Sequence, residues 1–194
     1  PGSLVTPNRG ERVIASLAEL VDALEEYLDP IDADQPDARW TGRVQAGTVS
    51  AFLRRLSSAV VRVGHLIRAG DSRRIDRASA QVTVVGIQSL HDLGQRFVVG
   101  ALLKEMFGEK ENSGQRFPLS VVVLDELNKY APREGQSPIK DMLIDIAQRG
   151  RSLGVLLVGA QQTASRVAPE VLENAALRVA GRLDAAEAER SEYG

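Results

Sequence analysis

Hydrophobic positions in the first part of the chain recur at intervals of three and four residues, the spacing of one face of an α-helix. Over residues 11–28 they form a single stripe, which predicts an amphipathic helix. A second stripe predicts a helix over residues 48–69, which Gly70 is suited to end because glycine readily adopts a left-handed conformation. We therefore expect residues 1–80 to form a helical N-terminal segment of two amphipathic helices.

After residue 80 the pattern changes to short aliphatic and β-branched runs separated by helical stretches. Strands that alternate with helices favour parallel βαβ units, so residues 81–194 are expected to form an α/β core. Because the strands are nearly unbroken apolar runs, they predict a sheet covered by helices on both faces. The expected strands are 82–87, 119–124, 155–158 and 177–183, and the expected helices are 90–107, 138–148 and a short one near Glu170.

Two helix starts carry local signals. Ser89 stands three residues before Asp92, which is typical of a capped first turn, and Ser137 precedes Pro138, whose missing N–H costs nothing at the first helical position. Residues 108–115 are rich in Gly, Glu, Lys and Asn and are expected to form a surface connection. A polar helical stretch is expected to begin at Asp184.

The composition removes several classes of function. The 194 residues suffice for one well-buried domain, but they include no cysteine and two histidines, which excludes disulfides, thiolate metal sites and histidine clusters. No apolar run approaches the roughly 20 residues of a membrane-spanning helix, and the first residues do not resemble a secretory signal. A cytoplasmic location is therefore the default expectation.

The net charge of −2 conceals an uneven distribution. Acidic residues crowd positions 19–37 and arginines crowd positions 54–77. Two interpretations stay open: solvated helix faces, or an arginine surface that meets DNA phosphate.

The most distinctive chemistry lies at the end of the strand predicted at 119–124, which runs directly into Asp125 and Glu126. Ligands of open parallel sheets bind outside the carboxyl ends of the strands, and a buried strand that ends in two acids indicates a cation or solvent there. In a nucleoside triphosphatase the first acid helps to hold Mg²⁺ and the second positions or deprotonates the attacking water. The alternative is a strand that leaves the core through a charged turn.

The next strand, at 155–158, is followed by Gln161, Gln162 and Thr163. If the two strands are neighbours, they bring polar groups to one edge of the sheet. A neutral amide beside a phosphate can donate a hydrogen bond to a phosphoryl oxygen or orient water. By itself a pair of glutamines is more often part of a turn.

Arg149 and Arg151 lie between these two strands, where a predicted helix ends. A guanidinium group is suited to stabilising charge on a transferring phosphate. Arginine at a helix C-terminus also complements the helix dipole, and that is its more common role.

Taken in order, three segments resemble the HerA/FtsK group of P-loop motors, and HerA-like ATPases most of all. They are Val121–Pro132 (VVVLDELNKYAP), Ile146–Val167 (IAQRGRSLGVLLVGAQQTASRV) and Glu173–Asp184 (ENAALRVAGRLD). The resemblance covers residues 81–194 and implies a RecA-like parallel sheet flanked by helices. Residues 1–80 match only a helical insertion of this group.

The resemblance also implies a role for each polar residue. Asp125 becomes the Walker B acid on the magnesium side, acting through water, and Glu126 the catalytic glutamate. Gln162 becomes the sensor of the γ-phosphate of ATP. Arg151 resembles an arginine that contacts phosphate at a subunit boundary, and Arg149 is a weaker candidate for that role. The implied cofactors are ATP and Mg²⁺.

Partners follow from the resemblance alone. Motors of this group form hexameric rings that encircle double-stranded DNA, and HerA-type members work with a NurA-type nuclease in the processing of DNA ends. A homo-hexamer, duplex DNA and such a nuclease are thus expected partners of the parent protein.

One departure from the family pattern concerns the phosphate-binding loop. The sequence contains no Gly-x-x-x-x-Gly-Lys-[Ser/Thr] and no Gly-Lys pair, so no cradle for the β- and γ-phosphates is evident. Since that loop precedes the Walker B strand in this family, we expect a fragment that binds nucleotide weakly and does not hydrolyse it alone.

Two other functions remain open at this point. One is a non-catalytic RecA-like module for binding or assembly, in which Asp125 and Glu126 have merely persisted. The other is a P-loop ATPase of secretion or conjugation, which also has a Walker B strand followed by a polar sensor.

Overall fold

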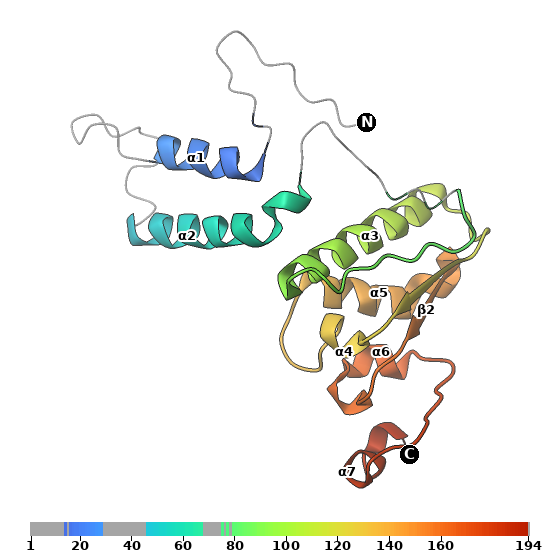
Figure 1. The fold of residues 1–194 in the computed structure, drawn as a ribbon. Helices are drawn as coiled ribbons and strands as arrows, with labels where there is room; N and C mark the ends of the chain where they lie inside the picture. The colour runs from blue at the N-terminus through green and yellow to red at the C-terminus, as the bar shows by residue number, and fades with distance from the viewer. Residues whose placement is uncertain are drawn as a thin grey trace. The chain divides into compact units, whose positions relative to one another are not determined.

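The computed structural model of this protein describes residues 14, 16–28, 46–67, 75, 77 and 79–193. The chain divides into two compact units, residues 1–94 and 95–194 (Figure 1). The division predicted from the sequence, at residue 80, lies earlier in the chain than this one. Among the described residues, no helix has the length and the apolar content needed to span a bilayer.

The first unit contains two helices that pack on each other, α1 (Leu17–Leu28) and α2 (Ala46–Val63). Helix α1 begins after Ser16, because the Ser16 hydroxyl oxygen accepts a hydrogen bond from the Glu19 amide at 3.2 Å. The predicted start at residue 11 falls partly outside the described residues, and Ile14 is not helical.

Helix α2 ends earlier than the pattern predicts. Residues Gly64–Leu66 tighten into the 3-10 turn η1, and Ile67 is extended. Glycine and β-branched residues such as Val60 and Val63 are poor helix formers, which explains an end before residue 69. Gly70, the predicted stop, lies outside the described residues.

Most of helix α3 (Asp92–Ser113) belongs to the second unit. The predicted cap at Ser89 is wrong: the helix begins at Asp92, and the His91 imidazole nitrogen Nδ1 accepts the Leu93 amide at 3.2 Å. The predicted surface connection at 108–115 is wrong over its first residues, because the helix continues to Ser113. The Lys110 ammonium donates to the carbonyl oxygens of Arg116 and Pro118, which stabilises this last turn.

The sheet consists of two parallel strands, β1 (Ser120–Leu124) and β2 (Val155–Gly159). Their register pairs Ser120 with Val155 and Leu124 with Gly159. Helix α5 (Pro138–Leu153) connects the strands and packs on β2 (Figure 1). The chain is therefore mixed α/β and mostly helical, with a parallel sheet packed against helices.

Helix α5 begins and ends at residues whose chemistry suits those positions. The Ser137 hydroxyl oxygen accepts from the Lys140 amide at 3.1 Å and Pro138 is the first helical residue, as the sequence predicts. The helix runs past the predicted end to Gly154, which has φ +73°. A Cβ atom at Gly154 would collide with the Arg116 carbonyl oxygen, so only glycine fits there.

The remaining elements of the second unit are short. They are α4 (Leu127–Tyr130), the 3-10 turn η2 (Ala164–Arg166), α6 (Pro169–Glu173), α7 (Ala185–Ala188) and the 3-10 turn η3 (Ser191–Tyr193). The predicted short helix near Glu170 and the helical stretch after Asp184 are both confirmed. The core of this unit gathers side chains from α3 to α6, among them Leu103, Phe107, Leu127, Tyr130, Leu143, Ile146, Val155, Val167, Val171 and Leu172.

Two predicted strands are wrong. Residues 82–87 and 177–183 form no regular secondary structure and carry no strand pairing in the described part of the chain. Most of their aliphatic side chains face solvent, with Val84 and Val179 each 87% exposed. An extended segment becomes a strand only when a neighbour takes up its backbone N–H and C=O groups.

The sheet is not covered on both faces as predicted. Helix α5 covers the face that contains Val155, whereas Val121 and Val123 of β1 are 57% and 68% exposed. Leu156 and Val158 of β2, their register partners, are exposed on the same face. Apolar character along a strand therefore does not identify a covered face.

Candidate functional site

Strand β1 leads directly into the two acidic residues. The side chains of Asp125 and Glu126 are exposed, and the Glu126 amide donates to Asp125 Oδ1 at 2.9 Å. Asp125 and Glu126 form a turn directly after the strand. Glu126 then occupies the N-cap position of α4.

Glu126 has a left-handed backbone conformation, with φ 54° and ψ 50°. Among the described residues it is the one residue other than glycine with positive φ. Such a conformation costs a residue with a Cβ atom about 1–3 kcal/mol and persists only where the surrounding structure enforces it. Strain of this kind concentrates at functional sites, which makes Glu126 the most notable backbone position in the chain.

The residues that follow β1 and β2 lie side by side. The Ala160 amide donates to the Leu124 carbonyl oxygen at 2.9 Å, and the Leu127 amide donates to the Ala160 carbonyl oxygen at 3.0 Å. The backbone on either side of Asp125 and Glu126 is thus hydrogen-bonded to Ala160, which directly precedes Gln161 and Gln162. Both polar segments leave the sheet at the same edge.

Helix α4 holds this edge in place. Leu127 is buried against Gly159, where a Cβ atom would collide with the leucine side chain. The Lys129 ammonium donates to the Gln95 side-chain oxygen of α3 at 2.6 Å. The glycine that ends β2 therefore permits the close approach of Leu127, the residue after Glu126.

The two glutamines differ in environment. Gln162 is exposed. The Oε1 atom of Gln161 is buried and has no hydrogen-bond donor among the described residues. The sequence predicts Gln162 as a site residue but not Gln161, because the pattern does not show which of two adjacent glutamines is buried. An unsatisfied buried oxygen is costly, and it marks this end of β2 as unusual.

Arg149 is engaged within its own chain. It forms ion pairs with Asp145 and with Glu111, the latter at 2.7 Å, and its guanidinium lies 5.3 Å from the centre of the Phe107 ring. The hydrogen bond to Asp145, followed by the one to Glu111, raises the pKa of Arg149 above its usual range. The same bond to Arg149 lowers the pKa of the Asp145 carboxyl group. Arg149 therefore acts here as a surface connector of α3 and α5.

Arg151 lies in the last turn of α5 and is exposed. Because α5 ends where β2 begins, Arg149 and Arg151 lie at the amino end of β2. A five-residue strand separates its two ends by about 13 Å. The structure therefore brings the two acids and the glutamines to one edge of the sheet and places both arginines near the other.

Magnesium is compatible with this arrangement of oxygen ligands. Among the described residues no group of three or more His, Asp or Glu side chains could hold a metal ion unaided. Mg²⁺ in nucleotide sites keeps several waters and takes one or two carboxylates together with substrate phosphates. A single exposed carboxylate, that of Asp125, meets this lower requirement.

Comparison with protein-family models and with curated proteins found no match for this sequence.

Proposed function

We propose that this chain contributes the acidic and sensor residues of an ATP-hydrolysing DNA translocase or helicase of the HerA/FtsK type, with a RecA-like core. One observation carries the proposal: two paired parallel strands end at the same edge, one in the strained Asp125-Glu126 pair and the other in Gln161-Gln162. In open parallel sheets, this edge is where ligands bind.

Each polar residue has a distinct task in this proposal. Asp125 holds Mg²⁺ through water, and the ion, when bound with ATP, neutralises charge on the phosphates. Glu126 accepts a proton from the attacking water. Gln162 donates a hydrogen bond to a γ-phosphate oxygen, without changing the charge of the site.

The strained backbone supports the role of Glu126. Glu126 has this conformation in the turn at the end of β1, directly after Asp125. A charged turn without a function has no need of this conformation, because glycine or asparagine at the same position would avoid most of the strain.

The position of the arginines supports a site shared between subunits in this proposal. Arg151 lies near the end of the sheet opposite Asp125, so we assign it to the nucleotide of a neighbouring copy. The ion pairs of Arg149 favour Arg151 over Arg149 for that role. We accordingly propose a homo-hexameric ring in the cytoplasm that acts on double-stranded DNA, with a NurA-type nuclease as a partner.

The phosphate cradle has to come from residues outside this sequence, which contains no Gly-Lys pair. The chain by itself is therefore expected to bind ATP weakly and not to hydrolyse it. The same absence favours a second candidate, a non-catalytic RecA-like module for binding or assembly.

The test is ATP hydrolysis by the full-length gene product. Glu126→Gln should keep ATP binding within about twofold and lower kcat by about 100-fold or more, the usual contribution of a general base. Glu134→Gln, which changes an exposed glutamate after α4, is the matched control and should leave kcat unchanged.

Equal turnover in Glu126→Gln and wild type would reject the catalytic assignment. Absence of turnover in the wild type would favour the non-catalytic module. Stimulation of turnover by duplex DNA supports the translocase, whereas stimulation only by an exported protein would favour the secretion or conjugation class.

A further inference from the structure

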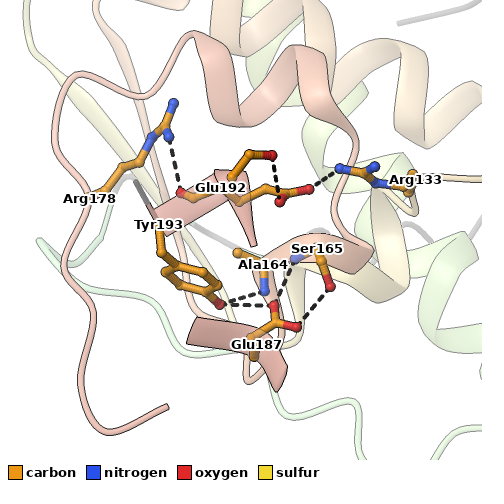
Figure 2. A network of polar contacts seen from close by, with 8 residues as sticks. Arg133, Ala164, Ser165, Arg178, Glu187, Glu192 and Tyr193 are labelled. Carbon is orange, nitrogen blue, oxygen red and sulfur yellow. Dashed lines mark hydrogen bonds and ion pairs between the residues drawn. The ribbon is translucent and has the colours of Figure 1, made fainter. Parts of the chain in front are cut away.

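Glu187 of α7 is a buried carboxylate, 7% exposed, that accepts three hydrogen bonds. The donors are the Ser165 amide at 3.0 Å, the Ser165 hydroxyl at 2.9 Å and the Tyr193 hydroxyl at 3.1 Å (Figure 2). Burial of a carboxylate is unfavourable unless donors replace its water, and here all the donors belong to two segments. Glu187 thus joins the C-terminal residues to the turn η2.

Tyr193 makes the second connection between the same segments. Its hydroxyl oxygen accepts the Ala164 amide at 3.0 Å while its proton is donated to Glu187 (Figure 2). The amides of Ala164 and Ser165 open η2, where the first N–H groups of a helical turn have no partner within the turn. The C-terminal residues therefore cap a turn that begins directly after Gln162 and Thr163.

The C-terminal residues are also fastened elsewhere. The Asp184 carboxylate accepts the Glu187 amide at 2.8 Å, which begins α7. Glu192 pairs with Arg133, and its carbonyl oxygen accepts from Arg178 at 3.3 Å (Figure 2). We call residues 184–193 the C-terminal latch.

The turn η2 is held from its other side by the residues that follow α4. The Arg133 amide donates to the Arg166 carbonyl oxygen at 2.8 Å, and the Ala168 amide donates to the Ala131 carbonyl oxygen at 2.9 Å. The Lys140 ammonium fixes this segment in turn by donating to the Arg133 carbonyl oxygen at 3.1 Å. The turn is therefore bonded both to the residues that follow α4 and to the C-terminal latch.

We propose that Glu187 is a positioning residue that fixes η2 and, through it, the exposed Gln162, so that the C-terminal latch controls the geometry of the sheet edge. The role in catalysis rests on the proposed function, but the mechanical connection does not. Loss of the latch leaves two N–H groups of η2 without acceptors. The segment from Gln161 to Thr163 is then fixed less firmly, because only the backbone bonds of Arg166 and Ala168 still hold η2.

The test follows amide hydrogen exchange in the 194-residue chain. Glu187→Gln removes the charge at nearly constant shape, Tyr193→Phe removes only the hydroxyl, and Glu189→Gln changes an exposed glutamate of the latch as the matched control. We expect Glu187→Gln to accelerate exchange at Ala164 and Ser165 by about tenfold, the effect of losing one ordinary hydrogen bond. Tyr193→Phe should accelerate exchange at Ala164 above all.

Two controls separate positioning from unfolding. Exchange in β1 and β2 should stay as in the wild type, and Glu189→Gln should change nothing. Unchanged exchange at Ala164 and Ser165 in both Glu187→Gln and Tyr193→Phe overturns the proposal. Acceleration spread equally over the strands also overturns it, because Glu187 would then serve stability alone.

Kinetics of the full-length gene product test the link to Gln162. Glu187→Gln should lower kcat by about tenfold with KM within about twofold, since a displaced sensor acts mainly in the transition state. If the wild type has no turnover but Glu187→Gln exchanges faster at η2, the proposed function is rejected. The proposal that the C-terminal latch fixes η2 is then still supported. Unchanged kcat with faster exchange would show that the latch does not position Gln162.

Discussion

The amide nitrogen of Leu127 donates a 3.0 Å hydrogen bond to the carbonyl oxygen of Ala160, and this bond joins the residues that follow β1 to those that follow β2. Leu127 comes directly after Glu126, and Ala160 directly precedes Gln161. The two polar segments are therefore connected through backbone, which side-chain substitution at the site leaves intact. Variants of the polar residues can then be interpreted as changes in chemistry.

The left-handed conformation of Glu126 predicts an unusual order of stability. Glu126→Gly should be more stable than Glu126→Ala by about 1 kcal/mol, because glycine adopts positive φ without the steric cost that alanine pays. Elsewhere in a chain, alanine is normally the more stable of the two. Urea unfolding of both variants measures the difference, and a more stable alanine variant would contradict the backbone geometry described for Glu126.

Two glycines should respond in opposite ways to a single methyl group. Gly154→Ala should destabilise the protein by about 2 kcal/mol or more, since the Cβ meets the Arg116 carbonyl oxygen and φ is +73°. Gly108→Ala, where no atom lies within 4 Å of the added Cβ, should stabilise α3 by up to about 1 kcal/mol. Thermal or urea unfolding of the pair tests this, and equal destabilisation would contradict the packing at Gly154.

These elements show how far the sequence predicts the fold. The strands that precede Asp125 and Gln161 are predicted correctly, because a short aliphatic run followed by polar residues is typical of a strand and its end. Residues 82–87 have the same local pattern, yet they remain exposed without a strand partner among the described residues. Pairing depends on a neighbour that may be distant in sequence, which local pattern does not contain.

Features of the candidate site that depend on tertiary geometry were also beyond the sequence. Nothing in the local sequence indicates that Glu126 takes positive φ, because the residue is neither glycine nor asparagine. The same holds for Glu187, which looks like one more exposed glutamate in a polar stretch. Its burial follows from donors supplied by Ser165 and Tyr193.

The pH dependence of stability should report on Glu187. Its pKa lies below the ordinary value of 4.5, first because the Ser165 amide donates to the carboxylate, with the Ser165 and Tyr193 hydroxyls and the charge of Arg190 acting in the same direction. A lowered pKa in the folded state means that this stabilisation is complete above pH 4.5 and is lost as the pH falls through the folded-state pKa.

Urea unfolding between pH 3 and 7 checks this by comparing the wild type with Glu187→Gln. The stability difference between them should shrink below about pH 4.5, because the protonated carboxyl and the amide are both neutral. Burial raises the pKa of Tyr193, so its hydroxyl keeps its proton throughout this range. A difference that stays constant down to pH 3 would contradict the ionised state of Glu187 in the fold.

Arg151 lies near one end of the sheet, and Asp125 and Glu126 lie at the other. We therefore expect two inactive variants of the full-length gene product, Arg151→Ala and Glu126→Gln, to complement each other when mixed. If the protein forms the proposed ring, assemblies made only of Arg151→Ala or only of Glu126→Gln should each lose most ATP turnover. Mixed rings should regain part of it, because some interfaces pair an intact Glu126 with an intact Arg151. Arg149→Ala should retain more activity than Arg151→Ala. Mixtures no more active than the separate variants would contradict a site shared between subunits.

If the segments after β1 and β2 form one nucleotide site, Mn²⁺·ATP should broaden amide NMR signals of both segments in the 194-residue chain. Mn²⁺ replaces Mg²⁺ as a probe, and weak binding suffices. We expect amides near Asp125, Glu126 and Gln162 to broaden together, and Asp125→Asn to weaken the effect at all of them. Broadening at scattered acidic residues, or at only one of the two segments, would contradict it.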